Sequence, residues 1–128
     1  MKRNLIAAMA LLCSATIATA QEAVAELDTS VHCAAVFGVI AMDQQRGALS
    51  ADAYPDLRLR GREFFVQIGA RLIDELQLTR EQVRDRFASE VTAIRTASAA
   101  NPAALQDMAR PCLALLDAAL PPAPGRSQ

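Results

Sequence analysis

The stretch VHCAAVFG, residues 31–38, holds the only histidine of the chain, His32, directly beside Cys33. Histidine and cysteine serve metal binding, covalent haem attachment and nucleophilic catalysis, and each chemistry demands a particular spacing. Haem attachment needs C-x-x-C-H, whereas here the histidine precedes a lone cysteine. A structural zinc site takes four Cys or His ligands, and beyond residue 20 the chain offers only His32, Cys33 and Cys112. No metal site is therefore expected.

The same two residue types also fail the requirements of thiol catalysis. No C-x-x-C redox motif is present, and neighbouring residues of one helix point about 100° apart, so His32 cannot activate Cys33. A disulfide crosslink is the role that remains for Cys33. Because Cys13 belongs to the expected signal peptide, Cys33 and Cys112 are the even pair left, and we predict a disulfide between them. His32 is expected at the surface or its boundary, with a pH-sensing role left open.

Arg58 and Arg62 are the other residues whose spacing could serve binding. Four residues apart on a helix, they share a face and could grip a phosphate or a carboxylate of a partner. The alternative, which we favour, is an exposed helix face balanced by Asp56 and Glu63.

Carboxylates and glycines provide no further chemistry. The pairs Asp74–Glu75 and Glu81–Asp85 are local helix-surface pairs, whereas acid–base catalysis needs two carboxyls in different environments across a cleft. We therefore expect no catalytic residue and no cofactor. Three glycines, Gly38, Gly61 and Gly69, interrupt helical patterns. Close helix packing is the usual reason, and a groove for a ligand is the alternative.

The N-terminus has the three parts of a secretory signal peptide: basic Lys2 and Arg3, an apolar run, and small residues at positions 18 and 20. We predict cleavage after Ala20, and reject lipoprotein processing because Leu12, before Cys13, is not small. The expected organisation is a signal peptide over residues 1–20, one domain over 21–120 and a disordered Pro-rich tail over 121–128. The expected location is the periplasm, or the outside of the cell.

Helical periodicity dominates the domain, and strand patterns are nearly absent. The predicted helices run from Asp28–Ser30 to about Arg46, from Pro55 to about Leu76, from the Thr79 capping box to about Ala97, and from Asn101–Pro102 onward. A backward extension of the first helix through residues 21–28 is the alternative to fraying of that stretch. The last is expected to kink or split at Pro111. The predicted fold is all-α, a small four-helix bundle stapled by one disulfide.

The charge balance narrows the classes of partner. The whole chain carries 13 basic and 14 acidic residues, and removal of Lys2 and Arg3 leaves a mildly acidic domain without the electrostatic footprint of nucleic-acid binding. We expect a non-enzymatic module that binds another envelope protein or itself, without stable membrane insertion. A carrier or sensor of a small apolar ligand is the first alternative, and a hydrolase or transferase the second.

Overall fold

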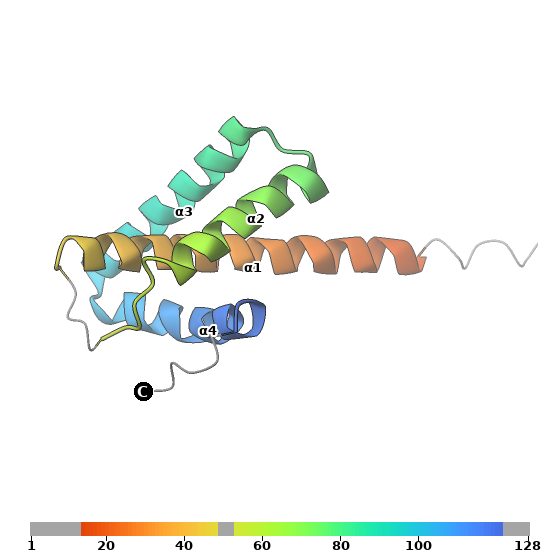
Figure 1. Ribbon diagram of the computed structural model, residues 1–128. Helices are drawn as coiled ribbons and strands as arrows, with labels where there is room; N and C mark the ends of the chain where they lie inside the picture. Colours follow the sequence, from red (N-terminus) through yellow and green to blue (C-terminus); the bar gives the residue numbers. More distant parts are fainter. Residues whose placement is uncertain (1–13, 49–52, 122–128) are drawn as a thin grey trace, which may run out of the picture.

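The computed structural model describes residues 14–48 and 53–121. Within these ranges the chain forms four α-helices and no strand, which confirms the all-α class. The helices are α1 (Ser14–Gln45), α2 (Arg60–Leu76), α3 (Arg80–Ala100) and α4 (Ala103–Ala119). Helix α1 lies between the other three, with the α2–α3 hairpin rising on one side in this view and α4 lying on the other (Figure 1).

The core forms around α1 because this helix is buried on nearly every side from Ser30 to Ile40. Phe37 of α1 meets Phe64 of α2 edge to face, with ring centroids 5.5 Å apart. The other helices each contribute a stripe at steps of three and four. The fully buried large side chains include Phe37, Phe64, Leu27, Ile40, Leu57, Leu72, Ile94 and Leu116.

Helix α1 begins earlier than predicted, at Ser14 rather than near Asp28, and runs continuously past the predicted cleavage point at Ala20. Residues 18–26 are all exposed, so this extension stands clear of the core (Figure 1). The helix ends at Gln45, and Gly47 follows with φ +68°, a left-handed conformation that glycine adopts without strain. Residues 1–13 of the predicted signal peptide lie outside the described part of the chain.

Length and composition would allow the segment Ala18–Gln45 to cross a membrane. However, 56% of its apolar window is buried inside the protein, as in the core helix of a globular domain. Its position near the N-terminus is also compatible with a signal sequence.

The predicted start of the second helix at Pro55 is wrong by about one turn, since α2 begins at Arg60. The side chain of Gln44 holds the preceding segment in a non-helical path. Its Nε2 donates to the Pro55 carbonyl at 2.8 Å, and its Oε1 accepts from the Leu57 N–H at 3.0 Å. Contacts from α1, which local sequence does not reveal, therefore decide where α2 begins.

Helix α3 begins where the capping box predicts. The Thr79 hydroxyl accepts from the Gln82 N–H at 3.2 Å, and the Thr79 N–H donates to Gln82 Oε1 at 2.8 Å. Helix α4 follows a second cap, in which Asn101 Oδ1 accepts from the Ala103 N–H. Pro111 does not split α4, which is one helix over Ala103–Ala119. The predicted tail lies outside the described residues from position 122 onward.

A disulfide joins α1 to α4. Cys33 and Cys112 lie with their Cα atoms 5.1 Å apart, and both side chains are buried. The two buried stripes that carry them were predicted from periodicity, and their pairing closes the chain across a separation of 79 residues. Such a bond indicates an oxidising compartment.

Candidate functional site

A hollow lies at the surface between α1 and the beginning of α2. Its walls are Gly38, Ala41, Met42 and Gln45 from α1, Gly61, Arg62 and Phe65 from α2, and Arg58 from the turn before α2. Residues at i, i+3, i+4 and i+7 share one helix face, so one face of α1 forms its side of the hollow. We call it the α1–α2 hollow. Its volume is about 230 Å³, and it is open to solvent.

Two of the three helical glycines shape this hollow in different ways. A Cβ added at Gly61 would lie 3.0 Å from the Phe37 Cβ, so glycine at this position lets α2 pack closely on α1. At Gly38 an added Cβ would meet nothing within 4 Å, so this residue leaves open space in the hollow. Gly69, outside the hollow, makes ordinary contacts with Val83 and Phe87 of α3. Both interpretations of these glycines, close packing and a groove, thus have a structural counterpart.

The two predicted arginines both line the hollow, but their electrostatic states differ. Arg58 is held by Asp56, with Nε–Oδ1 and Nη2–Oδ2 distances of 2.9 and 2.7 Å. This bidentate contact lowers the pKa of Asp56 to about 2 and raises that of Arg58. Arg62 makes no hydrogen bond or ion pair among the described residues, and Glu63, expected to balance it, makes none with its side chain either. Arg62 is therefore the cation available to a ligand.

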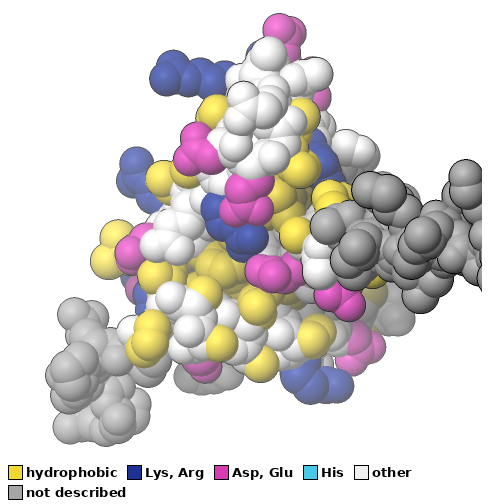
Figure 2. Space-filling model, turned by 90° about the vertical axis from the view of Figure 1, so that its right-hand side faces the viewer, with side chains coloured by type: hydrophobic (Ala, Val, Ile, Leu, Met, Phe, Trp, Pro, Cys, Tyr) yellow, Lys and Arg dark blue, Asp and Glu magenta, His cyan; other side chains and the backbone are white. Residues whose placement is uncertain are grey.

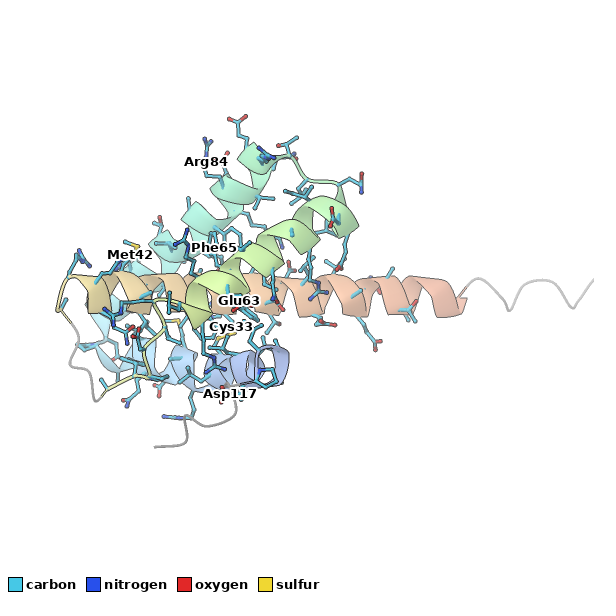
Figure 3. All side chains as sticks on the ribbon, in the orientation of Figure 1. Cys33, Met42, Glu63, Phe65, Arg84 and Asp117 are labelled. Carbon is cyan, nitrogen blue, oxygen red and sulfur yellow. A yellow bond between two sulfur atoms is a disulfide. The ribbon has the colours of Figure 1, made fainter. Side chains whose placement is uncertain are left out.

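Two large apolar side chains stand at the rim of the hollow on the same side of α1 (Figure 3). Met42 of α1 is 48% exposed and Phe65 of α2 is 37% exposed. The Phe65 ring also packs against Phe87 of α3, with centroids 4.1 Å apart. Apolar surface and an unpaired guanidinium are thus presented together.

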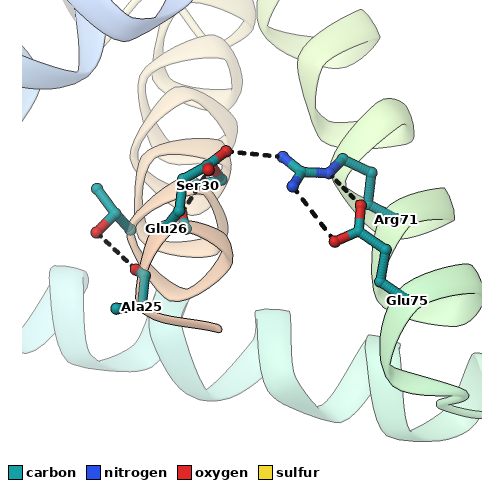
Figure 4. Close-up of polar contacts among 6 residues, drawn as sticks. Ala25, Glu26, Ser30, Arg71 and Glu75 are labelled. Carbon is teal, nitrogen blue, oxygen red and sulfur yellow. Dashed lines mark hydrogen bonds and ion pairs between the residues drawn. The ribbon is translucent and has the colours of Figure 1, made fainter. Parts of the chain in front are cut away.

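The carboxylates form ion pairs with arginines and do not converge on a cleft. Glu75 and Glu26 both contact Arg71, which links α2 to α1 (Figure 4). Glu81 and Asp85 share Arg84 on the surface of α3. The Arg71 contacts link α2 to α1, and the Arg84 contacts stay within α3.

Asp43 is the polar residue that sequence reasoning missed. It is 7% exposed, and both of its oxygens accept from Arg95 of α3 at 2.8 Å. Arg46 also contacts it. Hydrogen bonds from Arg95 outweigh the effect of burial and lower the pKa of the Asp43 carboxyl. The available signal was its position four residues after Val39 on the buried stripe.

His32 occupies the predicted boundary position, with 38% of its side chain exposed. Its Nδ1 lies 3.1 Å from Oε2 of Glu90 on α3. Among residues 14–48 and 53–121, no three Cys, His, Asp or Glu side chains are grouped as metal ligands.

The surface seen along α1 mixes acidic, basic and hydrophobic side chains without a large area of one sign (Figure 2). The α1–α2 hollow is distinguished by its apolar rim and by Arg62. Comparison with protein-family models, curated proteins and solved structures finds no match for this chain.

Proposed function

We propose that this chain is an exported, non-enzymatic binding module whose binding surface combines the α1–α2 hollow with the outward side of α2. The observation that carries the proposal is the unpaired Arg62 beside the exposed side chains of Met42 and Phe65. A basic group next to exposed apolar surface fits a protein segment that carries a carboxylate beside an apolar side chain.

The size of the hollow supports a protein segment over a small molecule. Pockets for small ligands usually span about 300–1,000 Å³, and this hollow has about 230 Å³ and is open. A side chain presented by a partner needs no larger site. The alternative of an apolar ligand carried in the bundle gains no support from this volume, and the alternative of a hydrolase gains none from carboxylates paired with arginines on separate surfaces.

The periplasm is the compartment we propose. The disulfide between Cys33 and Cys112 fits an oxidising environment, and the apolar N-terminal sequence fits export. The proposed partner is accordingly another envelope protein or a second copy of the chain.

Site-specific photocrosslinking in the producing cell tests the proposal. A photoreactive residue replaces Met42, at the rim of the hollow, and in the control replaces Thr92, which is exposed on α3. We expect a discrete crosslinked product from position 42 and none from position 92. Arg62→Ala should weaken that product, because the partner then loses its ion pair. Absence of a product from position 42, or equal products from both positions, would contradict the proposal.

A further inference from the structure

The outward side of α2 carries three exposed apolar residues at intervals of seven. They are Leu59, Val66 and Ile73, with exposed fractions of 77%, 61% and 37%, and we call them the outer stripe. A spacing of seven residues keeps side chains almost in line along a helix, with a drift of about 20° per heptad. Leu59 precedes α2 with helical backbone angles, and its carbonyl accepts from the Glu63 N–H, so it continues the line of the helix.

The outer stripe is not needed for the core of the domain. The buried residues of α2 are Gly61, Phe64, Ile68 and Leu72, which lie on the opposite side of the helix. Three apolar side chains aligned at heptad spacing supply one of the two apolar positions by which helices associate in coiled coils. The face therefore fits another helix.

The charges beside the outer stripe indicate which helix fits this face. By helical geometry, Arg62 lies on one flank of the stripe and Glu63 lies on the other. Arg58 precedes α2 and is already paired with Asp56. Arg62 and Glu63 both lack ion-pair partners among the described residues, and as sequence neighbours they cannot face each other. A helix that fits this face must present acidic groups to the first flank and basic groups to the second.

A second copy of α2 in parallel orientation meets this requirement. A two-fold axis along the helices brings the basic flank of each copy against the acidic flank of the other, and places Arg62 beside the Glu63 of the second copy. An axis across the helices gives the antiparallel arrangement, in which Arg62 lies level with Ala70 and Glu63 level with Gly69, so both charges stay unpaired. We therefore infer that the protein forms a parallel two-fold dimer through the outer stripe of α2, with Leu59, Val66 and Ile73 each packing on its counterpart.

This inference rests on the proposed function and deepens it by naming the partner: Glu63 of a second copy supplies the carboxylate that Arg62 binds. Sedimentation of the mature, oxidised protein over a concentration series tests it. We expect a reversible dimer and a dissociation constant raised about tenfold or more by Val66→Glu. The matched control is Val24→Glu, the same change at an exposed valine of α1, which should leave the dimer unchanged.

Charge exchange tests the pairing. Arg62→Glu should weaken the dimer about tenfold, because two acidic side chains then face each other at both symmetric positions. The double variant Arg62→Glu with Glu63→Arg should restore it. A cysteine crosslink tests the orientation of the two helices. In the parallel dimer, Leu59→Cys should form a disulfide with the same position of the second copy under mild oxidation, whereas an antiparallel dimer would place position 59 beside position 73.

The outcomes separate this inference from the proposed function. A monomer at every concentration, a dimer indifferent to Val66→Glu, or crosslinking of position 59 only to position 73 would overturn the parallel dimer. If the wild type is monomeric while a photoreactive residue at position 42 captures another protein, the dimer is refuted and the binding function stands. If the protein is monomeric and position 42 gives no product, both fail.

Discussion

The Asp43 carboxylate accepts hydrogen bonds from Arg95 of α3 while its own side chain is nearly buried. Burial alone would favour the neutral acid, but the Arg95 guanidinium favours the charged form and lowers the pKa. The ion pair therefore links α1 to α3 at the end of α1 where the hollow lies.

The lowered pKa of Asp43 predicts how stability depends on pH. A carboxyl with a folded pKa below its unfolded value near 3.9 stabilises the protein fully above that value. The contribution is lost as the pH falls through the lower folded pKa. Asp43→Asn should cost about 1–3 kcal/mol at neutral pH, and the loss should shrink as the pH is lowered below about 4.

Urea unfolding between neutral and acidic pH measures this effect. Asp56→Asn is the control. Arg58 lowers the pKa of Asp56 to about 2, but both side chains are more than half exposed, so solvent screens the pair. We expect little change in the unfolding free energy for the control. A loss in Asp43→Asn that is the same at all pH values would contradict the assignment of the effect to the charged carboxylate.

Residue-scale prediction from sequence succeeded where chemistry is local and failed where it is not. The cysteine pair was identified by counting, whereas binding by Arg58 and Arg62 stays a prediction. Asp43 was missed because its partner Arg95 lies 52 residues further along the chain. The local sequence around Asp43 does not indicate which helix will pack against it.

At the scale of elements, the start of α3 is the best determined boundary. Both hydrogen bonds of its capping box are formed, between Thr79 and Gln82. Thr79→Ala removes the acceptor for the Gln82 N–H and should lower the unfolding free energy by about 1 kcal/mol. Thr96→Ala, which removes an exposed hydroxyl from the C-terminal part of the same helix, should cause no such loss. Thermal or urea unfolding compares the two variants, and equal losses would show that the box does not set the stability of α3.

The boundaries of α1 and α2 show the limit of local signals. The cap candidates Asp28, Thr29 and Ser30 lie inside α1, where the hydroxyls of Thr29 and Ser30 bond back to the carbonyls of Ala25 and Glu26 (Figure 4). Residues suited to capping need not cap when the preceding sequence is itself a good helix former. Pro55 likewise fails to begin α2 because Gln44 holds that segment.

At the scale of the whole molecule, every helix contacts α1, but the disulfide alone links α1 to α4 covalently. Periodicity predicted which helix faces are buried, and the two cysteines predicted one contact between distant helices. The order of helices around α1 could not be read from the sequence. It is recorded only in contacts such as Phe65 with Phe87 and Glu26 with Arg71.

The disulfide should decide whether this small domain stays folded. A crosslink across 79 residues lowers the conformational entropy of the unfolded chain. In the chain-entropy model this raises the free energy of unfolding by about 4.5 kcal/mol. Domains of this size have total stabilities of about 5–15 kcal/mol. Reduction, or replacement of both Cys33 and Cys112 by alanine, should therefore lower the melting temperature by about 15 °C or more. Calorimetry of the oxidised, reduced and doubly substituted proteins measures this loss. If all three melt together, the four helices are held by their apolar contacts with α1, and the bond adds nothing to stability.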